Sequence, residues 1–350
     1  MAQDKEAIEL MGAPGSPYTR KMLGILRYRR IPYRLLPFTR NNSAAYLDRY
    51  GERPSPKVRL LPIFYLKDEQ GAKQAVCDST PLIRELESRF EGRSVVPDNP
   101  LLAFIDYLIE DYADEWLTKA MFHYRWSYPA DISKAGQMLP RWHNNTAPEA
   151  EINEASKTIT ELQISRLSYV GSNEATGPVI EESFTKFLEL LDNHLESNAF
   201  ILGSRPSASD FSIYGQLTCL ALFDPTPQAL VTNQAPRIYA WTESLEDLSG
   251  YELLPGDWPQ HSSIPNTLLA LLGHIVEIYL PYLIANSEAV EAGAESMTTV
   301  ISGRSWTQNP FPYQAKCLSW IRRSYGDLPE QDQLALDRSI EGTDISQYLS

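Results

Sequence analysis

The chain has 350 residues, of which 43% are hydrophobic and 22% are charged, a composition typical of a globular protein with a sizeable core. This length predicts two domains, or two domains with an appendage. The formal net charge of −14 argues against nucleic acid or an anionic membrane surface as the main partner, because both repel an acidic surface.

The first ninety-five residues predict a mixed sheet with helices on both of its faces. A strand over 7–12 ends in a turn rich in Gly and Pro, and a helix over 18–28 follows it. A strand over 32–38 completes a β-α-β unit, and the β-rich runs 59–67 and 72–77 predict a hairpin. A helix then begins after a polar cap candidate and an early Pro. This order of elements is that of a thioredoxin-like domain over 1–95.

The rest of the chain is predicted to be helical, with an all-helical domain over 100–250 and a helical C-terminal extension over 251–350. Apolar residues recur at helical spacing from Leu101 to Trp116. Further helices are predicted near 149–170, 178–197, 208–223 and 236–248, and in the extension near 264–285, 287–301, 310–325 and 329–338.

One apolar stretch, 266–285, approaches the length of a membrane span. His274, Glu277 and Pro281 interrupt it, and their cost in lipid favours a buried helix over a membrane helix. The N-terminal residues lack the pattern of a secretory signal or a transit peptide, so we expect a cytoplasmic protein without a membrane partner. The three cysteines have no metal-ligand spacing, which predicts a reducing compartment and no metal site.

The first forty positions are locally basic inside this acidic chain, a feature that would suit a small anionic ligand. The residues concerned are Arg20, Lys21, Arg27, Arg29, Arg30, Arg34 and Arg40.

Four motifs follow one another at a characteristic spacing. Ser16-Pro17-Tyr18 begins the first helix, Leu61-Pro62-Ile63 enters a strand, Asp78-Ser79 precedes a helix, and 200–211 reads FILGSRPSASDF. In this order they resemble the motifs of the glutathione transferases. The chain departs from the family pattern in having Ser209 where alanine is usual and about a hundred residues beyond the usual end.

The resemblance implies a site for glutathione as cosubstrate, with Ser16 in the position of the catalytic serine or cysteine. Its hydroxyl and the positive end of the following helix would both stabilise a thiolate. The resemblance also implies a homodimer. The other residues that it assigns to glutathione are Pro17, Tyr18, Leu61, Pro62, Asp78 and Ser79.

A cis Leu61-Pro62 bond would turn the Leu61 main chain toward the peptide, while Asp78 would accept the ligand's ammonium group and Ser79 would donate to its carboxylate. Each motif also has a structural interpretation: Ser16 as a helix cap, Pro62 as a trans proline, and Asp78-Ser79 as an N-cap alone. For Ser207 and Asp210 we expect a structural capping box.

Two sets of side chains on the helix after residue 100 remain open to interpretation. The aromatic residues Tyr112, Trp116 and Tyr124 are predicted to line an apolar acceptor pocket, although aromatic residues at helical spacing usually belong to a core. The acidic residues of the same helix are expected to form a solvated face rather than an acid–base pair; they are Glu110, Asp111, Asp114 and Glu115.

The predicted function is that of a glutathione-dependent transferase, which uses the thiolate to attack an apolar electrophile or to reduce a peroxide. The alternative is a noncatalytic protein that shares the fold and binds a ligand or partner, because fold does not dictate function.

Overall fold

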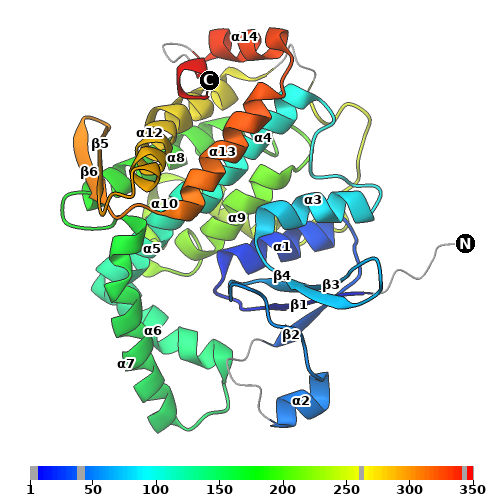
Figure 1. Ribbon diagram of the computed structural model, residues 1–350, viewed down its shortest axis with the longest axis vertical. Coiled ribbons are helices and arrows are strands. Elements are labelled where there is room, and N and C mark those ends of the chain that lie inside the picture. Colours follow the sequence, from blue (N-terminus) through cyan, green and yellow to red (C-terminus); the bar gives the residue numbers. More distant parts are fainter. Residues whose placement is uncertain (1–6, 38–43, 260–263, 341–344, 350) are drawn as a thin grey trace, which may run out of the picture.

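The computed structural model describes residues 7–37, 44–259, 264–340 and 345–349. A small α/β domain lies below a larger body of helices, and the C-terminal helices lie on that body (Figure 1). The elements of the first domain are β1 (Ile8–Gly12), α1 (Pro17–Tyr28), β2 (Tyr33–Pro37), α2 (Ala44–Tyr50), β3 (Ile63–Lys67), β4 (Lys73–Val76) and α3 (Ser79–Arg89). The predicted thioredoxin-like order is confirmed, with α2 as an unpredicted addition.

The four strands form one sheet in the order β2-β1-β3-β4. β1 pairs parallel with β2 and antiparallel with β3, and β4 is antiparallel to β3. The ends of β1 and β4 and the start of β3 therefore lie at the same edge of the sheet. This topology brings the residues after β1, before β3 and after β4 together, and these are the three segments that carry the N-terminal motifs.

β1 is a fully buried inner strand of this sheet. Its side chains alternate between two hydrophobic clusters, as strand geometry requires. Leu10 packs with residues of α1 and α3, including Leu26 and Leu82, while Met11 packs on the opposite face with Ile63.

The second domain is helical, as predicted, although the separate helices α6 and α10 were not. α4 continues through a π-helical turn, Ala113–Leu117, into α5, and α6 and α7 form a hairpin that projects from the body (Figure 1). The elements are α4 (Pro100–Tyr112), α5 (Thr118–Ser127), α6 (Pro129–His143), α7 (Glu149–Ser165), a 3₁₀ turn (Leu167–Val170), α8 (Gly177–Leu195), α9 (Ala208–Leu220), α10 (Pro225–Gln234) and α11 (Pro236–Ser244).

The two domains meet where α1 crosses α9 at close range. A Cβ on Gly215 would lie 2.6 Å from the Pro17 carbonyl oxygen, so only glycine permits this approach. The start of α9 is fixed by the predicted capping box, which is confirmed. The Asp210 carboxylate accepts from the Ser207 N–H at 2.9 Å and from the Ile201 N–H at 2.8 Å.

The C-terminal extension contains helices and one unpredicted hairpin. The expected helix over 287–301 is wrong beyond Glu291, because α12 ends before Gly293 (φ 63°) and Met297–Ile301 form a strand. Ser302 and Gly303 both have positive φ, the geometry of a tight hairpin turn. The elements are α12 (Asn266–Glu291), β5 (Met297–Ile301), β6 (Arg304–Gln308), α13 (Pro312–Gly326), α14 (Glu330–Ser339) and α15 (Ser346–Leu349).

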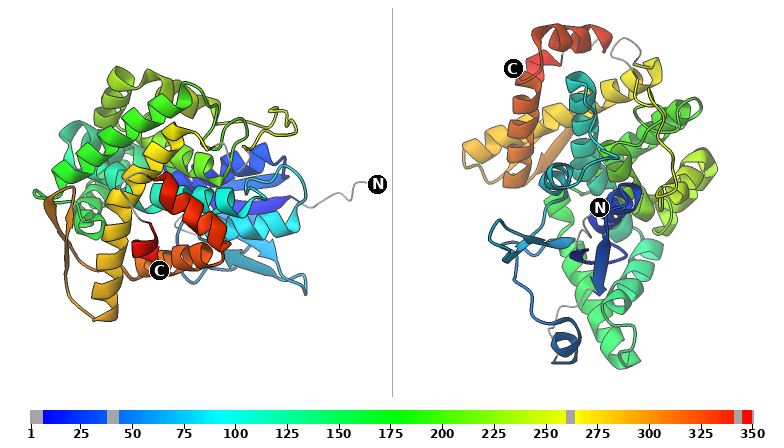
Figure 2. Two further views of the ribbon diagram at one scale, coloured as in Figure 1. Left: turned by 90° about the horizontal axis from the view of Figure 1, so that it is seen from above. Right: turned by 90° about the vertical axis from the view of Figure 1, so that its right-hand side faces the viewer.

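α12 is long and apolar enough to cross a membrane by length and composition alone. In this structure 56% of its most hydrophobic window is buried within the protein. It packs against α8, α13 and β5, and α12, α13 and α14 all contact α4 (Figure 2). These contacts are those of a core helix.

Candidate functional site

Ser16 lies in the loop between β1 and α1, at the edge of the sheet defined above. It is the N-cap of α1, and its Oγ accepts a hydrogen bond from the Thr19 N–H at 3.2 Å. The capping interpretation is therefore correct. In this cap, Ser16 Oγ acts only as an acceptor, so the hydroxyl hydrogen is left for another partner.

The peptide bond between Leu61 and Pro62 is cis, as the motif predicts. Pro62 is buried directly before β3, and Leu61 is half-buried beside it. The main chain at Leu61 thus lies at the same edge as Ser16, where an extended peptide could pair with it.

Asp78 precedes α3 in a conformation that is rare for a residue with a side chain, with φ of 88°. Among the described residues it makes no capping hydrogen bond to its own helix; instead its Oδ2 accepts from the Tyr313 hydroxyl at 2.9 Å. Burial raises the pKa of the Asp78 carboxyl, and the hydrogen bond from Tyr313 opposes this rise. The interpretation of Asp78 as an N-cap alone does not fit this geometry.

Ser79 is buried, and its side chain is already engaged within the protein. Its Oγ accepts from Lys21 Nζ at 3.2 Å and lies 3.2 Å from Asp114 Oδ2, to which it donates. The Ser79 hydroxyl is therefore already paired within the protein. The free N–H groups of the first turn of α3 remain at this position.

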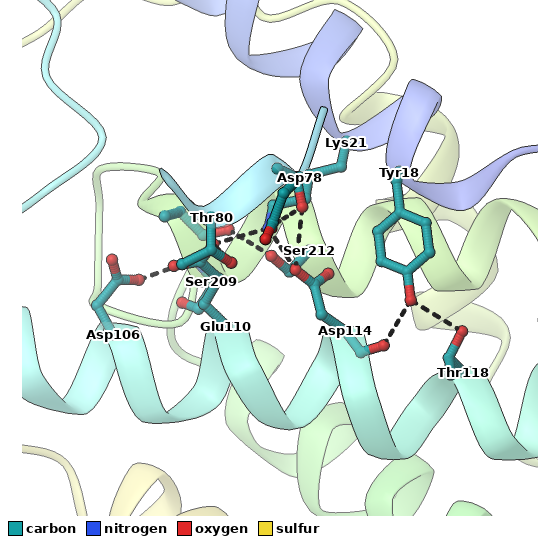
Figure 3. Close-up of polar contacts among 12 residues, drawn as sticks. Tyr18, Lys21, Asp78, Thr80, Asp106, Glu110, Asp114, Thr118, Ser209 and Ser212 are labelled. Atoms are coloured by element: carbon teal, nitrogen blue, oxygen red, sulfur yellow. Dashed lines mark hydrogen bonds and ion pairs between the residues drawn. The ribbon is translucent and has the colours of Figure 1, made fainter. Parts of the chain in front are cut away.

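Lys21 is a buried cation between the two domains, which the sequence analysis placed in a basic, ligand-facing segment. Its Nζ lies 2.7 Å from Glu110 Oε1 and 2.6 Å from Asp114 Oδ2 (Figure 3). Burial alone would lower the pKa of Lys21, but the two carboxylates outweigh this effect and hold it above its ordinary value.

The other described members of the basic segment also have acidic partners, which offset their charge locally. Arg40 lies outside the described residues. Arg20 and Arg27 pair with Glu246, Arg29 with Glu87, Arg30 with Glu252, and Arg34 with Glu9.

Tyr18 lies at the domain interface, with Pro17 buried beside it. The Tyr18 hydroxyl donates to the Asp114 carbonyl oxygen at 2.7 Å and lies 3.3 Å from Thr118 Oγ1 (Figure 3). Its polar group is therefore used to join α1 to the helical domain.

The acidic residues of α4 and the π-helical turn are buried, so the expected solvated face is wrong. Opposite the Lys21 side, the Tyr279 hydroxyl donates to Asp111 Oδ2 at 2.5 Å and Gln314 Nε2 donates to Glu115 Oε2 at 2.8 Å. Burial raises the pKa of Asp111 to about 7 and that of Glu115 to about 8. The extension thus meets these two carboxyls with neutral donors.

The three aromatic residues predicted to line an acceptor pocket are core residues. Tyr112, Trp116 and Tyr124 are all less than 5% exposed. Trp116 packs edge-on against Tyr282 of α12, while Tyr124 packs against α8. The extension and α8 therefore cover the faces of α4, the π-helical turn and α5 on which these aromatic residues lie.

Trp142, near the end of α6, is the aromatic residue that sequence analysis missed. A Cβ on Gly15 would lie 1.9 Å from its ring, so the indole packs directly on the main chain beside Ser16. Its ring centroid is 5.0 Å from that of Phe223, and the two rings pack in a tilted arrangement. Helical periodicity gave no signal for this pairing, because the two residues come from different elements.

The described residues contain no group of three or more His, Cys, Asp or Glu side chains that could hold a metal ion. The arrangement at the edge of the sheet is instead suited to a small peptide. It offers a hydroxyl at a helix N-terminus, a main-chain segment before β3, and a carboxylate beside the N-terminus of α3.

Comparison with known families agrees with this geometry. Residues 10–94 match the model of the glutathione S-transferase N-terminal domain, and residues 158–248 match that of the C-terminal domain. The chain belongs to the glutathione transferase superfamily. Members of this superfamily bind glutathione, and membership indicates a glutathione-binding, transferase-like function.

A search of curated proteins found no match. Solved structures similar to this glutathione transferase superfamily member include the tau class enzyme MiGSTU from mango, Mangifera indica, at 16% identity and a TM-score of 0.40, with 69% of this chain and 89% of that chain covered. The beta-etherase LigF from Sphingobium sp. strain SYK-6 has 14% identity and a TM-score of 0.46, with 68% and 94% covered. FzlA from C. crescentus has 13% identity and a TM-score of 0.39, with 73% and 96% covered.

Proposed function

We propose that this protein is a glutathione-dependent transferase in which Ser16 stabilises the thiolate. The observation that carries the proposal is the geometry of Ser16, whose Oγ accepts from the Thr19 N–H and keeps its own hydrogen for a sulfur anion. A thiol with a pKa of about 8.5 is mostly protonated at neutral pH, so a donor and the positive end of α1 would both raise the fraction of thiolate.

The peptide would be held at three points along the edge of the sheet. The main chain at Leu61 would pair with the ligand backbone, as an added strand pairs with a sheet edge. The Asp78 carboxylate would accept from the ammonium group of the ligand. The N–H groups at the start of α3, including that of Ser79, would bind its carboxylate.

The acceptor is proposed to be an apolar electrophile that lies against Trp142 and Phe223. The thiolate would form a carbon–sulfur bond, and the leaving group would depart with the electron pair of the broken bond. Reduction of a peroxide is the other reaction that the same thiolate could perform. We also propose a cytoplasmic location and a homodimer on the basis of family membership.

A noncatalytic binding protein is the second candidate, because the structure already uses two of the expected ligand groups. The Ser79 hydroxyl is engaged by Lys21 and Asp114, and Asp78 is engaged by Tyr313. Such a protein would bind a ligand or partner without promoting the reaction of glutathione with electrophiles.

Replacement of Ser16 by alanine separates these two functions. If Ser16 donates to sulfur, Ser16→Ala should raise the thiol pKa of bound glutathione and lower turnover at pH 6.5 by about ten-fold or more. The thiolate absorbance of the complex and the conjugation of a panel of electrophiles would report these effects. Ser88→Ala, which removes an exposed serine hydroxyl of α3, serves as the control. Equal turnover in wild type and Ser16→Ala would refute the mechanism, and binding without turnover in wild type would favour the noncatalytic alternative.

A further inference from the structure

We propose that Tyr313 of the C-terminal extension is a positioning residue of the glutathione site, which orients the Asp78 carboxylate toward the ammonium group of the ligand. This inference rests on the proposed function. It makes the extension a determinant of which peptides bind, because Tyr313 lies outside the residues matched by either family domain.

The contact joins two segments that are 235 positions apart in the chain. The Tyr313 hydroxyl donates to Asp78 Oδ2 at 2.9 Å, and both residues are half-buried. A carboxylate has about four acceptor sites. One donated hydrogen therefore leaves Asp78 able to accept from an ammonium group while its orientation is fixed.

Tyr313 is itself held firmly at the start of α13. The Asn286 side chain binds the main chain of Phe311 twice, accepting from its N–H at 2.7 Å and donating to its carbonyl oxygen at 3.0 Å. Gln314, the next residue, donates to buried Glu115, and the Tyr313 ring packs edge-on against Trp320. The first turn of α13 therefore presents the Tyr313 hydroxyl at a defined place.

The backbone at Asp78 explains why a positioning partner matters. A non-glycine residue with φ of 88° is strained, and strained residues persist where the surrounding structure supports them, commonly at binding sites. With the backbone in this conformation, the Asp78 carboxylate accepts a hydrogen bond from the Tyr313 hydroxyl. Without the hydroxyl, the carboxylate would lose this defined orientation.

The charged and titratable groups around Asp78 come from three elements. Lys21 of α1 favours its ionised form, Glu110 of α4 disfavours it, and α13 contributes both Tyr313 and the buried thiol of Cys317. Since burial raises the pKa of Asp78 and the Tyr313 hydrogen bond lowers it, loss of the hydroxyl should move the acid limb of glutathione binding to higher pH.

The test compares Tyr313→Phe with Tyr325→Phe by calorimetry on the full chain. Tyr325 is a matched control, because it lies on the same helix and its hydroxyl contacts Asp337, an aspartate of α14. Each variant is titrated with glutathione and with an analogue in which hydrogen replaces the α-amino group. Tyr313→Phe is also combined with Asp78→Asn, and glutathione binding is measured from pH 4.5 to 8.

We expect Tyr313→Phe to weaken glutathione binding by about ten-fold and to shift its acid limb to higher pH, with about two-fold change or less for the analogue and for Tyr325→Phe. In the Asp78→Asn background the second substitution should add nothing. Unchanged glutathione binding by Tyr313→Phe, or an equal loss for both ligands, would overturn the inference while leaving the proposed function intact. Failure of the wild type to bind glutathione at millimolar concentration would overturn both.

Discussion

The two sides of α4 and its π-helical turn bury carboxyl groups in different ways. On the side of the N-terminal domain, Glu110 and Asp114 share the cation Lys21. On the side of the extension, Asp111 and Glu115 meet the neutral donors Tyr279 and Gln314. On the first side, the packing of the two domains depends on the ion pairs of Lys21 with the two carboxylates. On the second side, the buried carboxyl groups retain protons near neutral pH.

The largest expected effect comes from removal of the cation. Lys21→Met would leave two buried carboxylates without their partner, so we expect a loss of about 3–5 kcal/mol in the free energy of unfolding at pH 7. Urea denaturation would measure the loss. The control is Lys186→Met, which breaks an exposed pair with Glu189 and should cost about 1 kcal/mol or less. Equal losses in the two variants would show that Lys21 is not the partner on which the domain interface depends.

A smaller effect is expected on the side of the extension, and it depends on pH. The folded-state pKa of Glu115 is raised to about 8 from an ordinary 4.5, so the folded protein binds more protons between these values. The contribution of Glu115 to stability is therefore full below pH 4.5 and is lost as pH rises toward 8. Glu115→Gln does not titrate, so it should gain at least about 1 kcal/mol of stability relative to wild type between pH 5 and pH 8.

Chemical denaturation of both proteins at several pH values would reveal this difference. The comparison with wild type cancels the other groups that titrate in this range, such as His274, whose pKa is lowered to about 4 by burial. Glu174→Gln, at an exposed position, is the control and should show no such trend. A difference between Glu115→Gln and wild type that stays constant with pH would mean that the two sides of α4 do not differ as described.

The difference between features set by a few neighbouring residues and features set by distant segments explains which parts of the structure the sequence could predict. Short motifs whose meaning is local were interpreted correctly: the cis Leu61-Pro62 bond and the capping box of Ser207 and Asp210 are confirmed. The neighbouring turn geometry decides such features, and it is encoded within a few residues. The thioredoxin-like order followed from the pattern of apolar residues and turns, and the family resemblance followed from the order and spacing of the motifs.

Features that depend on distant segments could not be predicted in this way. The residues of α4, the π-helical turn and α5 were assigned a solvated face and an aromatic pocket, because nothing in their own sequence shows that α8, α12 and α13 cover them. Tyr313 and Trp142 reach the site from elements that carry no motif. The β5–β6 hairpin had a signal, since Thr298 to Ile301 are rich in β-branched residues and Ser302-Gly303 follows them, but a helix was assigned there.

The most direct test of the account is a calorimetric titration of the purified protein with glutathione, beside Asp78→Ala. We expect binding by the wild type and binding at least about ten-fold weaker by Asp78→Ala, because the ammonium group loses its carboxylate partner. Absence of binding by the wild type at millimolar glutathione, or equal binding by the two proteins, would contradict a glutathione site at this edge of the sheet.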